Sequence, residues 1–139
     1  MSEDLDKLHA YYREGDRQFQ IAGGEAGCRK LANDFYDMMQ SLSEADHILK
    51  LHPRDLTESR EKLALFLCGY MNGPERYEET YGPLQLGPAH AHIPITSADR
   101  DAWLLCMRKA LEMQDYPQAF KDFMMKRFAV PAERIRNRP

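Results

Sequence analysis

The chain is poor in the features that mark several large protein classes. Its 139 residues contain three cysteines, Cys28, Cys68 and Cys106, an odd number with no two close together in sequence. A disulfide framework is therefore not expected, and each cysteine falls within an apolar helical pattern where a small buried thiol is common. We expect reduced thiols, as in a cytoplasmic protein.

Long apolar segments and charge runs are also lacking. The longest apolar run spans residues 63–71, too short to cross a bilayer, and the acidic N-terminus has no signal-peptide pattern. With 19 basic and 22 acidic side chains the net charge is −3, and no run of five like charges occurs. Because no broad positive field is available to bind a polyanion, we expect a soluble cytoplasmic protein with neither a nucleic-acid nor a membrane partner.

The alternation of apolar and polar residues that marks β-strands is nowhere sustained. Helical spacing recurs instead, so the sequence predicts an all-α protein, large enough to bury its own core. A short polar helix is expected over residues 3–13, and Gly23-Gly24 then breaks the chain. From Glu25 a longer helix is expected, with an apolar stripe comprising Cys28, Leu31, Ala32, Phe35 and Met39. Tyr36 lies beside this stripe, near its edge.

Three further segments are predicted between residues 55 and 113. Asp55 and Glu58 have the spacing of a capping box, opening a helix with one face formed by Leu63, Phe66, Leu67 and Tyr70. Residues 74–89 hold two glycines and three prolines and are expected to be mostly loop, with room for one turn. Thr96 or Ser97 then caps a helix whose inward residues are expected to be Ala102 or Trp103, Cys106, Met107, Ala110 and Met113.

Pro117 suits the first turn of a last helix. Helical spacing predicts that this helix buries Phe120, Phe123, Met124 and Phe128. The basic tail over residues 134–139 is expected to fray.

One pair of residues suggests a cofactor. His90 lies on a loop-like stretch thirteen residues before Trp103, the only tryptophan, in an amphipathic helix. An imidazole there could ligate a metal while the indole lines the pocket around it, a pairing that suggests haem. A non-haem metal carrier would need His/Glu pairs converging from several helices, and the five histidines offer none.

In order and spacing, a set of short motifs resembles the group II truncated haemoglobins, the two-over-two helical globins. The motifs are Gly-Gly-Glu-Ala-Gly (23–27), Phe-Tyr-Asp (35–37), His-Pro (52–53), Phe-Leu-Cys-Gly-Tyr-Met-Asn-Gly-Pro (66–74), Tyr-Gly (81–82), His-Ala-His-Ile-Pro-Ile (90–95) and Arg-Asp-Ala-Trp-Leu-Leu-Cys-Met (100–107). The resemblance runs from about residue 19 to 128. It implies an N-terminal helical extension (1–18), a truncated globin domain (19–130) and a C-terminal tail (131–139).

The resemblance implies a haem b cofactor with His90 as the proximal iron ligand, since a neutral imidazole is the usual axial donor of oxygen-binding haem proteins. His92, two residues away, is the nearest rival and would point elsewhere. On the opposite, distal face the resemblance implies a polar cage of Tyr36, His52 and Trp103. The Tyr36 phenol and the Trp103 indole would donate hydrogen bonds to a bound ligand.

Two alternatives for His52 remain open at this point. Its imidazole could donate to the ligand or relay a proton to peroxide, or it could only cap the bend that Pro53 imposes.

Further pocket residues are implied by position in the family. Ser59 would leave room for ligand entry, Lys62 would reach a haem propionate, and Leu63 and Phe66 would pack on the porphyrin. Leu86, Ile95 and Met107 are expected to form the proximal wall. Ala89 departs from the family, which often has arginine before the proximal histidine, so what anchors the propionates stays open.

The resemblance implies reversible binding of O2, and of NO, CO or peroxide, by a monomer or weak homodimer. Several distal donors predict slow oxygen release, which favours redox chemistry of oxygen, nitric oxide or peroxide over bulk oxygen transport. No flavin or nicotinamide motif is present, so electrons would come from an external reductase. Whether the chain is a dedicated enzyme stays open. The alternatives are an oxygen sensor or storage protein, and an interaction module without haem.

Overall fold

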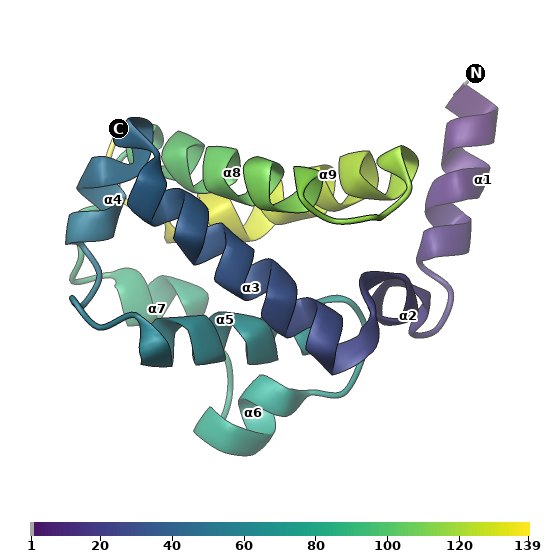
Figure 1. Cartoon of the computed structure of the whole chain (residues 1–139), viewed down its shortest axis with the longest axis horizontal. Coiled ribbons are helices and arrows are strands. Elements are labelled where there is room, and N and C mark those ends of the chain that lie inside the picture. Colours follow the sequence, from purple (N-terminus) through teal and green to yellow (C-terminus); the bar gives the residue numbers. More distant parts are fainter. Residues whose placement is uncertain (1) are drawn as a thin grey trace.

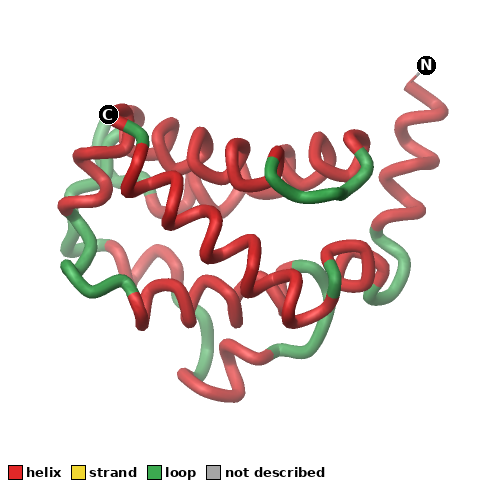
Figure 2. The backbone as a smooth tube through the Cα atoms, viewed as in Figure 1, coloured by secondary structure: helices red, strands yellow, loops and turns green. Residues whose placement is uncertain are grey.

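The computed structural model describes residues 2–139, and within that range every regular element is a helix (Figures 1 and 2). The helices are α1 (Ser2–Tyr12), α2 (Arg17–Ala22), α3 (Gly24–Ser41), the 3-10 helix η1 (Ser43–Ala45), α4 (Asp46–Lys50), α5 (Thr57–Tyr70), α6 (Arg76–Tyr81), α7 (Leu86–His90), α8 (Ser97–Glu112) and α9 (Gln118–Ile135). None of the helices in this range combines the length and apolar character of a membrane span. The prediction of an all-α protein is confirmed.

Four helices form the two layers of a sandwich. Helix α3 crosses the molecule diagonally and packs against α5 in its own layer and against α8 in the other, while α8 and α9 lie side by side in opposite directions (Figure 1). This arrangement is the two-over-two helical sandwich expected from the sequence. The short helices α4, α6 and α7 connect the long ones.

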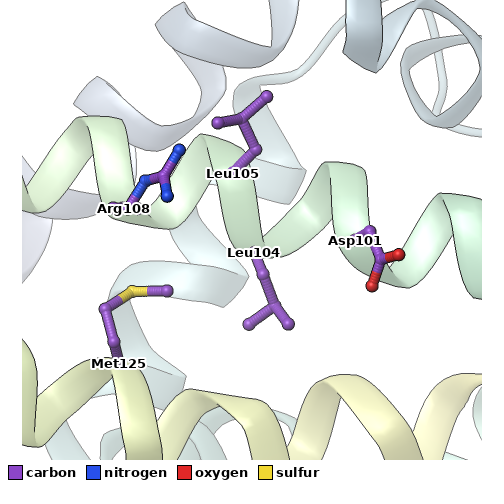
Figure 3. Close-up of a pocket in the computed structure, with 5 residues that line it drawn as sticks. All are labelled: Asp101, Leu104, Leu105, Arg108 and Met125. Atoms are coloured by element: carbon purple, nitrogen blue, oxygen red, sulfur yellow. The ribbon is translucent and has the colours of Figure 1, made fainter.

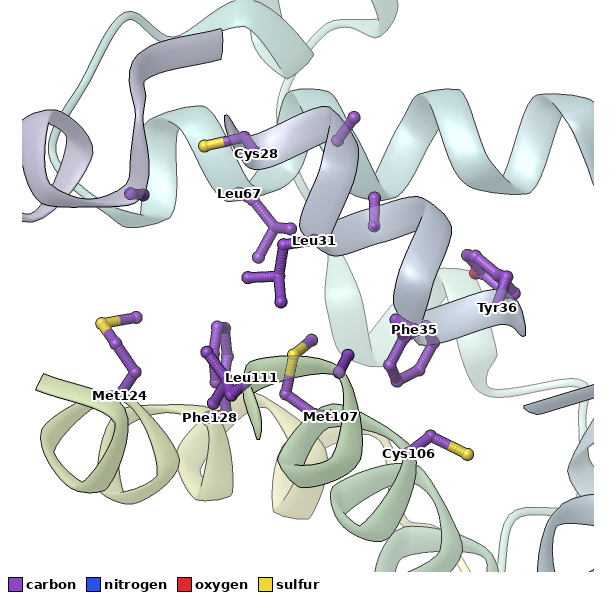
Figure 4. Close-up of a cluster of buried hydrophobic side chains, with 14 of the residues drawn as sticks. Cys28, Leu31, Phe35, Tyr36, Leu67, Cys106, Met107, Leu111, Met124 and Phe128 are labelled. Carbon is purple, nitrogen blue, oxygen red and sulfur yellow. The ribbon is translucent and has the colours of Figure 1, made fainter. Parts of the chain in front are cut away.

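The core lies where α3 meets α8 and α9 (Figure 4). The predicted stripe of α3 is buried, and Leu31 and Phe35 are fully enclosed. The four residues predicted to be buried in α9 are also enclosed: Phe120, Phe123, Met124 and Phe128. Burying one such side chain contributes roughly 1.5–3 kcal/mol, so this layer contact contributes substantially to the stability of the fold.

The three cysteines are buried free thiols, as the sequence predicts. The side chain of Cys28 on α3 contacts that of Cys68 on α5, where burial raises the pKa of both thiols. Burial likewise raises the pKa of Cys106 to about 11. All three sulfurs are therefore protonated near neutral pH.

Two glycines allow α2 to pass directly into α3. Gly23 has φ 99°, a left-handed conformation that other residues rarely adopt. At Gly27 an added Cβ would lie 1.7 Å from the carbonyl oxygen of Ala22. The Gly-Gly-Glu-Ala-Gly motif is thus explained by a close backbone approach.

Two predicted details of helices α5 and α8 are wrong. Asp55 does not form a capping box with Glu58, because α5 has Leu56 as its N-cap and Glu58 is only the second helical residue. The Asp55 carboxylate instead accepts a hydrogen bond from the Thr57 backbone N–H at 2.9 Å. Met113 is 48% exposed rather than inward, because α8 ends at Glu112.

Residues 74–89 are more helical than predicted, since they contain α6 and all but the last residue of α7. Gly87 and Pro88 lie in the first turn of α7. The first N–H groups of a helix have no intrahelical partner, so proline is tolerated there. His90 is therefore the last residue of a short helix and not part of a loop.

The C-terminal tail is ordered, and the prediction that it frays is wrong. Helix α9 continues to Ile135, and the backbone N–H groups of Asn137 and Arg138 both donate to the carbonyl of Ile95 at 3.0 Å. These long-range hydrogen bonds attach the tail to the segment before α8. Sequence alone carries no local signal of this pairing.

The N-terminal extension is joined to the core by aromatic packing. Tyr12 of α1 is buried against Phe120 and Phe123, with ring centroids 5.3 and 5.1 Å away. The side chain of Gln18 accepts a hydrogen bond from Arg127 of α9. The expected boundary between residues 18 and 19 therefore lies inside α2.

Removing the cap of α8 tests this account of its start. The Thr96 hydroxyl accepts from the Asp99 N–H at 3.2 Å, and the Asp99 carboxylate accepts from the Thr96 N–H at 3.0 Å. We expect Thr96→Ala to lower the free energy of unfolding by about 1 kcal/mol in urea denaturation. Ser97→Ala, one residue inside the helix, is the control and should change it by less than about 0.5 kcal/mol. Equal losses in the two variants would contradict the assignment of the cap.

Candidate functional site

His90 is held in one tautomer by its own helix. Its Nδ1 donates a hydrogen bond to the carbonyl of Leu86, one turn earlier in α7, at 2.6 Å. A carbonyl oxygen can only accept, so Nδ1 carries the proton and the lone pair of the neutral ring is on Nε2. A hydrogen-bonded second nitrogen is the usual arrangement of a histidine that ligates a metal. His92 lies on the following turn and is exposed.

His52 is held in the same way on another element. It follows α4 at a bend, and its Nδ1 donates to the carbonyl of Ile48 at 2.7 Å. Burial lowers the pKa of His52, the Ile48 carbonyl partly opposes this, and the charge of His90 lowers it further. His52 is thus neutral at pH 7, with its Nε2 an acceptor.

Tyr36 stands beside His52. It is buried on α3, and its ring meets the imidazole edge-on with centroids 5.6 Å apart. Burial raises the pKa of Tyr36 to about 12, although Arg60 and a hydrogen bond with Ser59 oppose the rise. The phenol therefore remains a hydrogen-bond donor well above neutral pH.

Phe35 connects Tyr36 and Trp103, two residues of the predicted distal cage. Its ring lies 5.0 Å from that of Tyr36, at an interplanar angle of 88°, and 5.1 Å from that of Trp103 on α8. Trp103 is half-buried and also contacts Phe128. The structure thus places Tyr36, His52 and Trp103 in one connected cluster.

The predicted residues of α5 divide into two sets. Ser59 is within hydrogen-bond reach of Tyr36, and Leu63 and Phe66 are half-buried against the core. Lys62, in contrast, pairs with the Glu58 carboxylate at 2.8 Å and lies over the ring of Tyr81. A negatively charged ligand group would compete with Glu58 for this amine.

The three residues predicted for the proximal wall are not equivalent. Leu86 is half-buried at the start of α7, and Ile95 is buried just before α8. Met107 is fully enclosed in the core between the helical layers (Figure 4). Ala89, the position where the family often has arginine, is exposed.

Arg60 supports the distal cluster and was not identified from the sequence. Its guanidinium donates to the carbonyl of Asn33 and the carboxylate of Asp37, both at 2.9 Å, and lies 5.9 Å from the Tyr36 ring centroid. Asn33 and Asp37 are four residues apart on one face of α3. That spacing of polar groups around Tyr36 is the signal that could have identified a basic partner on α5.

A surface groove lies away from this cluster. It has a volume of about 300 Å³ and is lined by Asp101, Leu104, Leu105, Arg108 and Met125, from α8 and α9 (Figure 3). None of the predicted site residues lines it. The candidate site is therefore the cluster around Tyr36 and not this groove.

The donor set of the cluster fits haem. His90 offers one imidazole Nε2, and Leu63, Phe66 and Trp103 offer half-buried apolar surface on two helices. A flat apolar group with a metal at its centre would use both features, whereas a metal ion alone would use only the first. Tyr36, which is buried, adds a hydrogen-bond donor to the cluster.

Comparison with known proteins agrees with this chemistry. Residues 18–137 match the family described as bacterial-like globin. The group 2 truncated haemoglobin YjbI of Bacillus subtilis is 33% identical over 115 residues, covering 82% of this chain and 84% of the relative.

Two solved structures extend the comparison. The cold-adapted truncated haemoglobin of the Antarctic bacterium Pseudoalteromonas haloplanktis TAC125 superposes with a TM-score of 0.83 and 30% identity, covering 86% of this chain and 97% of its own. The group II 2-on-2 haemoglobin of Agrobacterium tumefaciens gives 0.83 and 33%, covering 88% and 95%. The chain belongs to the bacterial-like globin family, as a group II truncated haemoglobin with the haem cofactor that this family implies.

Proposed function

We propose that the protein binds dioxygen and related small ligands at a haem b whose iron is ligated by Nε2 of His90. The observation that carries the proposal is the hydrogen bond from His90 Nδ1 to the Leu86 carbonyl, which leaves Nε2 available. Tyr36, His52 and Trp103 then form the distal side, and Leu86 and Ile95 belong to the proximal side. When bound, haem supplies an iron that takes a diatomic ligand and exchanges one electron.

The distal side chains have different roles toward that ligand. The Tyr36 phenol is the donor, because its pKa is raised to about 12 and it keeps its proton. Neutral His52 presents an acceptor at Nε2 and cannot donate from that atom. A ligand that carries its own proton, such as hydrogen peroxide, could be deprotonated there. This arrangement favours the proton-relay role of His52 over a second donor.

A strong donor in a sheltered site slows release of a ligand with partial negative charge. A carrier that releases slowly delivers poorly, so we propose redox chemistry of nitric oxide, peroxide or oxygen as the role. In the nitric oxide reaction, dioxygen, nitric oxide and one electron would combine to give nitrate, and a ferrous haem held by His90 would supply that electron. An external reductase would then restore the ferrous state.

Rapid mixing tests the proposed role. One equivalent of nitric oxide, added anaerobically to the oxygenated protein, should give one equivalent each of nitrate and ferric protein within the mixing time. Stopped-flow absorbance and ion chromatography measure the two products. An oxygenated protein that survives this addition unchanged would contradict redox chemistry and support storage or sensing.

The ligand assignment is tested by replacing each of two neighbouring histidines. His90→Ala should lose the ferrous optical spectrum of the wild-type protein, because no other imidazole is held in the same position, and added imidazole should restore it. His92→Ala is the matched control and should keep the wild-type spectrum, since His92 is exposed. The reverse pattern would show that the assignment is wrong.

The donor role of Tyr36 is tested by oxygen release. Tyr36→Phe should raise the oxygen dissociation rate about tenfold, because one hydrogen bond contributes about 1 kcal/mol or slightly more. Stopped-flow replacement of oxygen by carbon monoxide measures the rate. Tyr11→Phe, which removes a hydroxyl from an exposed tyrosine, is the control and should leave the rate unchanged.

The donor role of Tyr36 also predicts how the oxygen dissociation rate depends on pH. The phenol donates only while protonated, and a pKa of about 12 keeps it so across the neutral and mildly alkaline range. The wild-type rate should therefore stay flat from pH 7 to about 10 and rise only as the pH approaches 12, whereas Tyr36→Phe should show no such rise. A rise centred on the ordinary tyrosine pKa would contradict the buried donor.

A further inference from the structure

The side chain of Asn137 closes a set of hydrogen bonds around the segment that follows His90. Its Nδ2 donates to the carbonyl of Ile93 at 2.7 Å and to the carbonyl of His90 at 3.2 Å. Its Oδ1 accepts from the backbone N–H of Ile95 at 2.9 Å. One amide thus holds three backbone groups of residues 90–95, the connection between α7 and α8.

The backbone of the tail adds to this attachment. The N–H groups of Asn137 and Arg138 both donate to the Ile95 carbonyl, at 3.0 Å each. Ile95 is therefore bonded to the tail through both its N–H and its carbonyl, and the residue as a whole is 6% exposed. Together these bonds pair residues more than forty positions apart in sequence.

The tail itself is fixed by charged groups at the end of α9. The Glu133 carboxylate accepts from Arg136, in the tail, and from Arg100 of α8 at 2.6 Å. Hydrogen bonds from these two guanidinium groups lower the pKa of Glu133 to about 2. The carboxylate therefore stays ionised at any physiological pH, and the start of the tail is tied to α8 as well as to α9.

Helix α7 needs such support because it has only five residues, far fewer than an isolated helix requires. The carbonyls of its last turn have no intrahelical partner. At one end, the His90 imidazole is bonded to Leu86, and at the other the His90 carbonyl is bonded to Asn137. His90 is thus held through its side chain and through its backbone.

We infer that Asn137 is a positioning residue for His90, which fixes the backbone of the proximal helix and through it the direction of the imidazole Nε2. The inference rests on the proposed ligation of iron by His90. An asparagine suits the role because its amide combines a donor that reaches two carbonyls with an acceptor for one N–H. An aspartate keeps the acceptor and loses the donor, so the two functions can be separated.

The test compares the full-length haem-loaded wild-type protein with Asn137→Ala, Asn137→Asp and the control Arg138→Ala. Among residues 2–139 the Arg138 guanidinium donates only to the neighbouring Asn137 carbonyl, so its removal leaves the amide contacts intact. Resonance Raman spectra of the ferrous, ligand-free proteins report the iron–histidine stretch. Transfer of hemin to an excess of a haem-scavenging globin reports the rate of haem loss.

Both Asn137 variants should shift or broaden the iron–histidine band, and haem loss should accelerate about tenfold, the fold-change expected for about 1.4 kcal/mol of lost hydrogen bonding. Arg138→Ala should match the wild type in both. In the haem-free proteins, hydrogen exchange of the Ile95 amide should accelerate in Asn137→Ala and less in Asn137→Asp, which keeps the acceptor.

Three results would overturn the inference. An unchanged Raman band in both variants would do so even if their free energy of unfolding fell, because a purely structural tail would lower stability without turning the imidazole. Equal shifts in Arg138→Ala and Asn137→Ala would also do so. A wild-type chain that takes up no hemin would instead remove the proposed ligation itself, and with it the basis of the inference.

Discussion

The contact of Phe35 with both Tyr36 and Trp103 is the interaction on which the arrangement of the site depends. Phe35 is fully enclosed in the core, whereas its neighbour Tyr36 reaches the site from the same turn of α3. Trp103 belongs to the opposite layer of the sandwich and meets Phe35 at 5.1 Å. The packing of the two helical layers thus sets the separation of Tyr36 and Trp103. A shift of α3 against α8 would alter the core and the site together.

The two histidines of the site, His52 and His90, make the same kind of backbone hydrogen bond. Each donates from Nδ1 to a carbonyl four residues earlier, so each presents Nε2 as a lone pair. They differ in their neighbours: His52 lies against the Tyr36 ring, and His90 has its carbonyl bonded to the tail. The same backbone hydrogen bond therefore leaves Nε2 available in both residues, for the iron ligation proposed for His90 and for the proton acceptance proposed for His52.

Much of the helical core and of the candidate site could be predicted from the sequence. The spacing around Leu31 and Phe35 and the aromatic residues of α9 reflect local periodicity, and the sequence indicated both helices. Motif resemblance brought Tyr36, His52 and Trp103 together, and the structure shows them as one cluster. The sequence identifies His90 but not its helix. Gly87 and Pro88 are tolerated in the first turn of a helix and disrupt a helix interior, so their presence alone does not decide between helix and loop.

The remaining features depend on contacts between distant parts of the chain. Asn137 is one polar residue in a basic tail, and nothing near it in sequence indicates that it would meet Ile95. The three enclosed thiols, by contrast, follow from the helical pattern, and they have a chemical consequence. Oxidants attack the thiolate, and burial keeps Cys28, Cys68 and Cys106 in the protonated form. Under the proposed chemistry with peroxide or nitric oxide, these thiols would therefore react slowly with either oxidant, so repeated turnover would spare the protein's own cysteines.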